Sequence, residues 1–506
     1  MQIETKRKKG KSCSQIHLQK LVDAYQKNKF HQVISEAKKL LTEYPECTNL
    51  LNIIGAAMTA IGHYETAIKH FMQAIKISPS YPDSYNNLGN LFLQNNDHKS
   101  AQKVFNTSIK LNPNYPIAYC NLGKSYLACN QPKMAIINFQ NAIKLQPGYL
   151  DAMNNLGRAY IASSQFEKAI EIFKFVISKN TNNPAAHIGF GLALFYTNDL
   201  HAAQESFVKA LELDPSNTEA FNFLLNVRKN YVGHPTRSND IINLDNKIRH
   251  DLACYTHASS NLEINSSLNK SFDKVRHLSK NLKLNQTQIF VRNSQDLNCM
   301  RHTQIFNEQN IISDFCFSCF KVQILVYSFI DLVRLSSLFY ELDFEGELLR
   351  KTMVETRDYT AGQYKGFVYC RSIECAEKIS MILKGKTEGF LDNPKIQIKR
   401  GCSEFSLSYK KYGEVCRDTA QTMQYPKEWK LQESKFDQEY SFPISSAKIM
   451  SMREFSLSDL LIFEQWVDYA KGLGDPTVRF FDDKKIKHQE MFNAGLKRAG
   501  VNNGTN

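Results

Sequence analysis

Six side chains in the second half of the chain have the types and spacing of metal ligands. A Cys-x-x-Cys pair stands immediately before an apolar run, and a Cys-x-x-His pair stands thirteen residues ahead of it. Structural Zn²⁺ takes four tetrahedral sulfur or nitrogen ligands, and a pair spaced by two residues supplies two of them from one turn. The pattern predicts a zinc cofactor held by some four of six residues: Cys299, His302, Cys316, Cys319, Cys370 and Cys402.

The same cysteines allow other interpretations. An iron–sulfur cluster is one, although the spacing matches no familiar cluster run. A catalytic thiol is another, because Cys370 starts an expected helix and Cys402 stands beside Lys399 and Arg400, and positive charge favours a thiolate. Buried, inert thiols are the third, since cysteine is among the residue types most often fully buried. Without an apolar signal segment near the N-terminus, the twelve cysteines favour free thiols or metal ligands over disulfides.

Alternating strands and helices are expected around these cysteines. Their order, strand, helix, strand, strand, helix, strand, is that of a split βαβ or ferredoxin-like α+β sheet. In that topology the first strand lies between the third and fourth strands and runs antiparallel to both, so its start meets their ends and gathers distant cysteines there. The expected strands are 320–326, 351–356, 366–370 and 395–400, and the expected helices are 329–341 and 373–384.

The third expected strand carries a weaker signal for RNA binding. Phe367 and Tyr369 alternate with Val368 and therefore share one face, and Tyr364 is a candidate to join them. RNA-recognition motifs stack bases on aromatic side chains of the corresponding strand. The stretch lacks the full octamer of those motifs, and such aromatics commonly pack under helices. RNA binding is thus an alternative function of this sheet.

The first half of the chain repeats with a fixed period of 34 residues. Each unit predicts two amphipathic helices joined by a polar turn and ended near a proline. The small residues are expected where the two helices cross closely, and the phenylalanines are expected to fill the gap to the next unit. The repeating residues are Gly55, Gly89, Gly123, Gly157 and Gly191; Ala67, Ala101, Ala135, Ala169 and Ala203; and Phe71, Phe105, Phe139, Phe173 and Phe207.

The repeat signature resembles that of the tetratricopeptide repeat family. Its Leu-Gly-x-x-Tyr and Ala-x-x-x-Phe elements stand here as Leu122, Gly123, Tyr126, Ala135 and Phe139. The resemblance implies a superhelix of helix pairs with a concave groove that binds a protein or peptide. The repeats also resemble those that precede the catalytic domain of O-linked N-acetylglucosamine transferases, although the region after them is too short for that domain and lacks its motifs.

Three asparagines recur on the first helix of successive units, two residues before the glycine. They are Asn87, Asn121 and Asn155, and the row is broken at Ile53 and Gly189. In the family that the repeats resemble, this position faces the groove. Amides carry both a donor and an acceptor, so a ladder of exposed amides can bind the backbone of an extended peptide. Ordinary solvated asparagines are the alternative.

The chain is too long for one core, because single cores rarely exceed roughly 250 to 300 residues. Five good repeat units occupy 47–217, and 15–44 fits a degenerate first unit with Val33 and Ala37 in the Ala and Phe places; the helix after Pro215 is expected to cap the stack. The expected segments are a basic tail at 1–14, a TPR superhelix at 15–232, a polar helical connector at 233–288, a Cys-rich α+β domain at 289–420 and a helical region with a tail at 421–506.

The net charge of +13 suits a polyanionic partner, or a lysine-rich surface that serves solubility. No apolar run reaches the roughly 20 residues of a membrane span, and we expect a cytoplasmic protein. No phosphate-binding glycine loop, nucleophile elbow or His-Glu-x-x-His is present. The sequence therefore favours an interaction scaffold over an enzyme. The alternative is a protein-modifying transferase that recruits substrates through the repeats, which requires a cleft with convergent residues such as Glu355, Arg357, Arg400 and Glu404.

Overall fold

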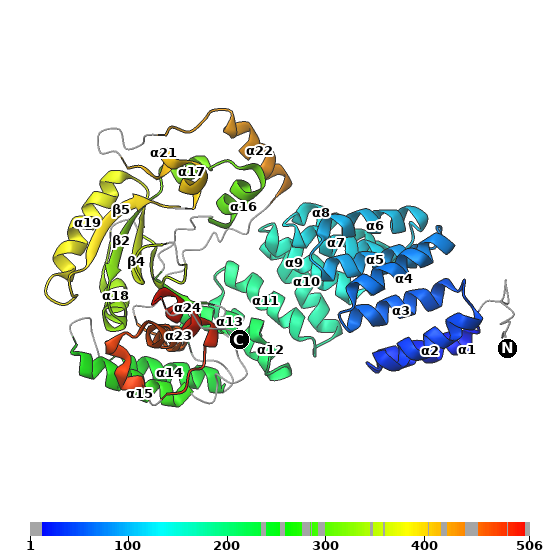
Figure 1. Ribbon diagram of the computed structural model, residues 1–506, viewed down its shortest axis with the longest axis horizontal. Coiled ribbons are helices and arrows are strands. Elements are labelled where there is room, and N and C mark those ends of the chain that lie inside the picture. Colours follow the sequence, from blue (N-terminus) through cyan, green and yellow to red (C-terminus); the bar gives the residue numbers. More distant parts are fainter. Residues whose placement is uncertain are drawn as a thin grey trace. The chain divides into compact units, whose positions relative to one another are not determined.

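The computed structural model groups the chain into two compact units (Figure 1). The first unit comprises residues 1–172 with 439–443, and the second comprises 173–438 with 444–506. The structure describes residues 13–233, 239–253, 259–275, 284, 286–291, 299–344, 348–357, 360–402, 404–415, 423–440, 454–482 and 484–500. The predicted basic tail lies outside these residues, except for its last two positions.

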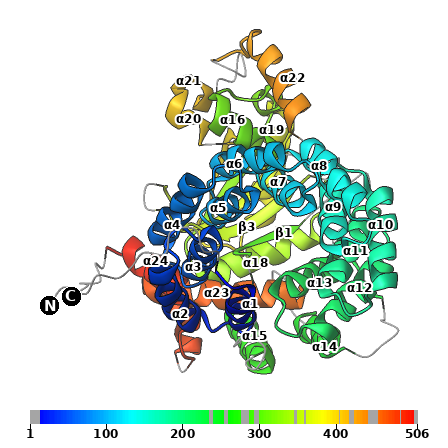
Figure 2. The ribbon, with the colours of Figure 1, turned by 90° about the vertical axis from the view of Figure 1, so that its right-hand side faces the viewer.

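Paired helices build the first unit, as the 34-residue period predicts. In Figure 2 the first helices α3, α5, α7 and α9 lie on the inner side of a curved row, and the second helices α4, α6, α8 and α10 lie on its outer side. The pairs are α1 (Gln15–Gln26) with α2 (Phe30–Glu43), α3 (Thr48–Ala60) with α4 (Tyr64–Ile77), α5 (Pro82–Gln94) with α6 (His98–Leu111), α7 (Pro116–Ala128) with α8 (Pro132–Leu145), and α9 (Leu150–Ala162) with α10 (Phe166–Lys179).

Each helix pair turns at a residue in the left-handed conformation. Only glycine adopts this region without strain, and asparagine is the next most tolerant residue. The first pair has such a residue at the same place as the others, which confirms that the degenerate first unit is a structural repeat. The turn residues are Asn28, Gly62, Asn96, Asn130, Ser164 and, in the second unit, Asn198, with φ between 57° and 80°.

The repeating glycines let a phenylalanine of the same repeat pack against the helix backbone. A Cβ on Gly55 would lie 2.6 Å from Cε1 of Phe71, closer than real Cβ contacts come. Phe71 also packs with Leu88 and Leu91 of the next repeat. The phenylalanines therefore fill the crossing inside their own repeat as well as the predicted gap to the next one.

The second unit begins at Phe173, within α10, and contains the last repeat helices. The pair α11 (Pro184–Tyr196) and α12 (Leu200–Leu213) is followed by α13 (Thr218–Asn230), which was expected to cap the stack. Two basic residues of α13, Arg228 and Lys229, are instead buried. They bond to α14 (Asp240–Leu252) and α23 (Leu457–Leu473), and α15 (Asn261–Val275) completes the helices found in the predicted connector.

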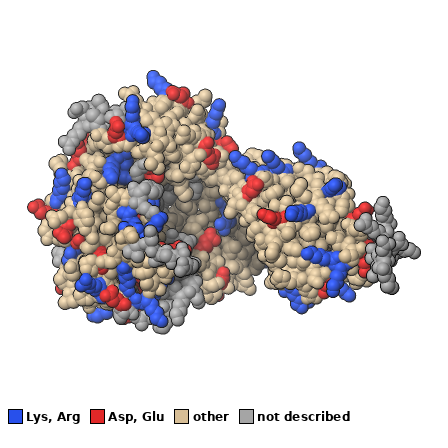
Figure 3. All heavy atoms as spheres, viewed as in Figure 1, with Lys and Arg blue, Asp and Glu red and all other residues tan. Residues whose placement is uncertain are grey.

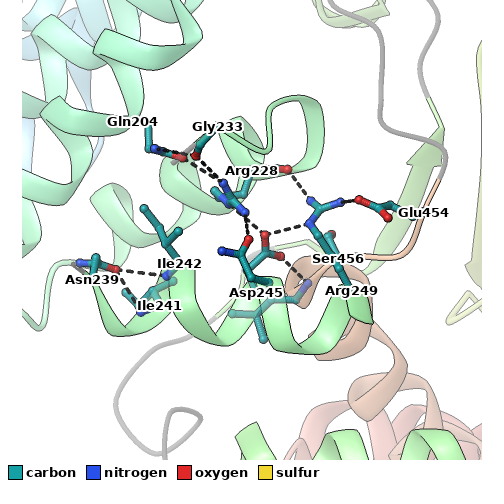
Figure 4. Close-up of polar contacts among 12 residues, drawn as sticks. Gln204, Arg228, Gly233, Asn239, Ile241, Ile242, Asp245, Arg249, Glu454 and Ser456 are labelled. Atoms are coloured by element: carbon teal, nitrogen blue, oxygen red, sulfur yellow. Dashed lines mark hydrogen bonds and ion pairs between the residues drawn. The ribbon is translucent and has the colours of Figure 1, made fainter. Parts of the chain in front are cut away.

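A buried ion network holds α13 and α14 together (Figure 4). The carboxylate of Asp245 accepts hydrogen bonds at 2.9 Å from Nε of Arg228 and from Nε of Arg249, and all three side chains are buried. Its other oxygen accepts from the backbone N–H of Leu457, the first residue of α23. Removing one partner of such a network would strand a buried charge, so the three helices are tied into one unit.

A second buried carboxylate extends this connection. Asp459 of α23 accepts from Nζ of Lys229 at 2.9 Å and from the hydroxyl of Tyr340 at 3.0 Å. Tyr340 lies on α18 (Phe329–Glu341), which packs on the sheet. Helix α13 is thus joined through α23 to the sheet.

The sheet has five antiparallel strands in the order β1-β3-β4-β2-β5. The four predicted strands have the predicted neighbours, with β2 between β4 and β5. The sequence reasoning missed the edge strand β1, which has only four residues. The strands are β1 (Gln288–Val291), β2 (Phe320–Val326), β3 (Arg350–Val354), β4 (Tyr364–Cys370) and β5 (Lys395–Arg400).

Helices α18 and α19 (Ile373–Thr387) lie on one side of the sheet (Figure 1). Gly366 of β4 lies directly under Leu335 and Phe339 of α18. Among the described residues, no helix is both long and apolar enough to cross a membrane. The remaining helices are α16 (Cys299–Gln309), α17 (Asp314–Phe317), α20 (Phe405–Ser408), α21 (Lys410–Gly413), α22 (Trp429–Glu439), the 3-10 helix η2 (Pro476–Phe481) and α24 (Gln489–Arg498).

Candidate functional site

The cysteines meet at one end of the sheet, as the strand order predicts. Cys370, the last residue of β4, pairs with Phe320, the first residue of β2. The backbone N–H of Gly401, just beyond β5, donates to the carbonyl oxygen of Cys319 at 2.9 Å. The start of β2 therefore lies between the ends of β4 and β5.

A small apolar core covers Cys316 and Cys402 beyond this end of the sheet. Cys316 is buried with Phe317, Phe405 and Tyr412, and Cys402 packs against them. The hydroxyl of Tyr412 donates to the carbonyl oxygen of Cys316 at 3.0 Å. These contacts are those of a packed hydrophobic cluster.

Most of the thiols are held in the protonated form. A hydrogen bond between the Cys316 and Cys402 thiols, together with burial, raises the pKa of Cys316, and the same bond lowers the pKa of Cys402. Burial raises the pKa of Cys319 to about 12 and also raises that of Cys370. Among these four thiols, Cys402 is the one whose pKa is shifted toward the thiolate.

The Cys-x-x-His pair is divided between surface and core. Cys299 starts α16 and is exposed, whereas His302 is 4% exposed and its ring stacks on Phe315 with centroids 5.2 Å apart. Within the described ranges, no three His, Cys, Asp or Glu side chains are grouped so that they could hold a metal ion. The described residues do not fit the predicted zinc site, and we derive no function from it.

Of the four residues named for an enzyme cleft, three are bonded together and Arg400 lies apart. Glu355 accepts from Arg357 at 2.8 Å, and Arg357 also donates to Glu404 at 2.8 Å. Burial disfavours ionisation of Glu355, but hydrogen bonds from Arg357 and Lys365 lower its pKa to about 2. Arg400 is buried elsewhere, with its guanidinium 4.4 Å from the ring centroid of Phe320. Glu355, Arg357 and Glu404 are thus joined by ion pairs, Lys365 supplies the second positive charge, and these four charges balance one another in a structural network.

The sheet face opposite α18 and α19 carries lysine and aromatic side chains, and we call it the lysine face. In the strand register, Phe290, Lys351 and Phe367 stand side by side on β1, β3 and β4. Phe367 and Tyr369 share this face as predicted. Tyr364 points to the other face and donates to Asp475 at 2.7 Å, so its expected place beside them is wrong. The face includes Gln288, Phe290, Lys321, Gln323, Leu325, Lys351, Met353, Lys365, Phe367, Tyr369, Gln397 and Lys399, and Glu355 bonds to Lys365 beside it.

Two lysines of the lysine face were missed by sequence reasoning. Nζ of Lys321 donates to the carbonyl oxygen of Gly401 at 2.8 Å, and Nζ of Lys351 donates to Oε1 of Gln288 at 3.2 Å. Burial, with the charge of Lys321, lowers the pKa of Lys351 to about 8. Alternation along each strand gives no common face for the two lysines; the strand register does so through Tyr369 and Phe367 of β4.

The predicted peptide-binding asparagines have different surroundings. Asn121 is 8% exposed, and its Nδ2 donates to Oδ1 of Asn86 in the preceding repeat at 3.0 Å. Asn87 is half-buried and donates to Asn52 of the preceding repeat at 3.4 Å. Asn155 is half-buried and donates to the backbone of its own helix at Asp151. The expected exposure of Asn121 is therefore wrong, and the binding role of the ladder stays a prediction.

Family models recognise the paired helices. Residues 55–96 and 89–130 match the TPR repeat, and 117–149, 150–178 and 185–217 match the tetratricopeptide repeat. The helix pairs within these ranges are tetratricopeptide repeats. No curated protein matches the chain, so the resemblance to O-linked N-acetylglucosamine transferases is not shown.

Several solved structures are similar to the TPR region. A chain of the APC/C hetero-tetramer Cut9–Hcn1 is 20% identical, with a TM-score of 0.39 over 42% of this chain; this chain spans only 42% of that one. YrrB, described as a TPR protein with an unusual peptide-binding site, is 19% identical with a TM-score of 0.31, over 37% of this chain and 95% of its own. PilF of Pseudomonas aeruginosa is 14% identical with a TM-score of 0.37, over 41% of this chain and 95% of its own.

Surface charge adds no second candidate site on the face drawn in Figure 3. Lys and Arg side chains are scattered there among Asp and Glu side chains. On this face the distribution is that of a solvated surface.

Proposed function

We propose that the TPR repeats of the first unit form a protein-interaction scaffold, which binds an extended segment of a partner protein along the first helices. The observation that carries the proposal is the polar row on α5 and α9. Asn87 and Asn155 are half-buried, their Nδ2 atoms are held by protein acceptors, and their Oδ1 atoms have no hydrogen-bond partner among the described residues. Such fixed acceptors suit the N–H groups of a peptide backbone.

The buried amide between them has a supporting role in this proposal. Asn121 joins α7 to α5 through Asn86, and Asn52 donates to Ser84 at 2.8 Å in the same way between α3 and α5. These bonds fix the first helices relative to one another. A fixed row of helices lowers the conformational entropy that binding must oppose.

Tyrosines at the starts of the first helices widen the proposed surface. Tyr81, Tyr115 and Tyr149 recur with the repeat period and are half-buried. The hydroxyl of Tyr81 donates to Asn49 at 2.9 Å, and burial raises its pKa to about 12, which keeps it a neutral donor. Tyrosine is enriched in protein interfaces because it combines apolar area with a polar end.

Peptide selection tests this function. Random peptides displayed on phage are selected against the full chain, and the affinity of the selected peptides is measured by fluorescence anisotropy. Replacing Asn87 and Asn155 together by Ala should weaken binding by roughly thirtyfold, since two hydrogen bonds of about 1 kcal/mol each would be lost.

Asn106→Ala is the matched control, because Asn106 is an exposed amide on the second helix α6 that donates to its own helix at Gln102. This variant should bind like the unchanged chain. Equal affinity of the double variant and the control would exclude the amides, and a selection that yields no saturable peptide would contradict the proposal.

We also infer a ferredoxin-like class for the sheet of the second unit. The order of strands and helices from β2 to β5 and the neighbours of each strand support it, with β1 as an added edge. A cytoplasmic location is a further part of the proposal. The ten cysteines within the described ranges are free thiols, as in reducing compartments.

A further inference from the structure

We propose that the lysine face binds a mononucleotide, with its phosphate between Lys321 and Lys351 and its planar base against Tyr369 and Phe290. Nothing in the peptide-binding role of the repeats requires this site. It is therefore a second function, located in the second unit.

The charge balance of the face points to an anion. Lys365, at the other end of the face, has a carboxylate partner, because its Nζ donates to Glu355 at 2.8 Å. Lys321 and Lys351 donate only to uncharged oxygens, and neither forms an ion pair with a described carboxylate. Lys321 is 7% exposed, and two nearby ammonium groups out of water repel each other. The charge of Glu404 acts on both lysines, but this carboxylate bonds to Arg357 at 2.8 Å. A bound phosphate would add the negative charge that the two ammonium groups lack.

The aromatic side chains point to a planar group beside that anion. The Nζ of Lys351 lies 5.7 Å from the ring centroid of Phe290, 5.4 Å from that of Phe367 and 5.9 Å from that of Tyr369. Phe290 and Tyr369 are half-buried and keep part of their rings accessible. Nucleobases stack on such rings.

Burial selects a single nucleotide over a nucleic acid strand. A strand needs an exposed row of rings for successive bases. Phe367, the central ring, is only 7% exposed and has the ammonium groups of Lys321 and Lys351 near it. Two half-buried rings with one deep pair of lysines match one base and one phosphate. This is also why we do not propose the RNA interface.

The remaining polar side chains of the face support such a ligand. Lys399 and Gln397 are half-buried on β5, and Lys399 pairs with Lys321 in the strand register. The side-chain amide of Gln397 donates to the side-chain oxygen of Gln323 at 3.3 Å, and this bond fixes the two amides side by side on the lysine face. A third lysine at the margin can meet a second phosphate or the ribose.

Isothermal titration calorimetry of the full chain tests the proposal. AMP, UMP, inorganic phosphate and a short oligouridylate are titrated separately into the protein. AMP or UMP should bind saturably and more tightly than inorganic phosphate. Lys351→Met removes the charge and keeps an unbranched chain, and it should weaken nucleotide binding roughly tenfold, the effect of losing one charge-assisted hydrogen bond.

Lys395→Met is the matched control, because Lys395 lies on the same strand as Lys399 but is exposed and pairs with Leu325 at the far end. Its affinity should equal that of the unchanged chain. The helix content and melting temperature of both variants show whether they fold. Saturable binding of the oligouridylate with weaker binding of both mononucleotides would overturn the proposal in favour of RNA. The proposal would also be overturned if neither nucleotide gave a saturable heat of binding, or if Lys351→Met and Lys395→Met lost nucleotide affinity equally.

Discussion

The two units treat their buried polar groups differently. In the repeats, buried amides satisfy one another across neighbouring helices, as Asn121 and Asn86 do. In the sheet unit, the paired charges of Arg228 and Asp245 join α13 to α14, while Lys321 and Lys351 on the lysine face form no ion pair with a carboxylate of the described residues. Hydrogen bonds between buried amides fix the relative positions of the repeat helices, as an interaction scaffold requires. Lysines without a carboxylate partner are expected where an anionic ligand binds.

The largest expected effect is on the paired charges of the sheet unit. Asp245→Ala leaves Arg228 and Arg249 buried without their carboxylate, and it should lower the free energy of unfolding of this unit by about 3 to 5 kcal/mol. Both tryptophans of the chain, Trp429 and Trp466, lie in this unit, so their fluorescence during urea unfolding reports on it.

The control is Asp151→Ala in the repeats. The pair of Lys124 and Asp151 is 2.8 Å long, but their side chains are 36% and 52% exposed. Surface pairs contribute about 0 to 1 kcal/mol, so the urea midpoint of the repeats, followed by far-ultraviolet circular dichroism, should barely move. A similar small shift for Asp245→Ala would show that the network does not hold the unit together.

A smaller effect is expected from pH on the lysine face. The groups that act on Lys351 are Lys321, Cys299, Glu404 and Arg357, and burial is the main cause of its lowered pKa of about 8. An anion binds the ammonium form, which is present below this pKa and lost above it. Nucleotide affinity should therefore fall up to about tenfold between pH 7 and pH 9. Calorimetric titrations at several pH values check this, and Lys351→Met should lose most of the dependence; an unchanged slope in that variant would refute the assignment.

The smallest expected effect concerns one amide of the repeats. Asn121→Ala removes its bond to Asn86 and should lower the free energy of unfolding by about 0.5 to 1.5 kcal/mol. The urea midpoint from far-ultraviolet circular dichroism should shift, while that from tryptophan fluorescence should not. Asn106→Ala, which removes an exposed amide, is the control. A shift in both signals would mean that the two units unfold together and would remove the distinction between them.

The helix pairs and most of the strands could be predicted from the sequence, because both depend on the spacing of nearby residues. The period of 34 residues located every helix pair, and alternation located four strands and their order. The edge strand β1 escaped because four residues carry too little pattern. The thiols were correctly brought together by topology, but spacing cannot distinguish ligands from a packed cluster around Cys316.

The lysine face was missed for a similar reason. Only strand register places Phe290 and Lys351 side by side, although they are distant in sequence. The exposure of the ladder asparagines could not be predicted from the sequence either, because Asn87 and Asn121 occupy the same repeat position and differ in burial. Burial depends on neighbouring helices, and the repeat period does not specify it.

The central claim is that the first helices of the repeats hold a partner segment. A selected peptide carrying a benzoylphenylalanine is cross-linked to the full chain by light, and the linked residues are mapped by mass spectrometry. The links should fall within α5, α7 and α9, at residues 82–94, 116–128 and 150–162. Links confined to the second helices α6, α8 and α10, or to the sheet unit, would contradict it.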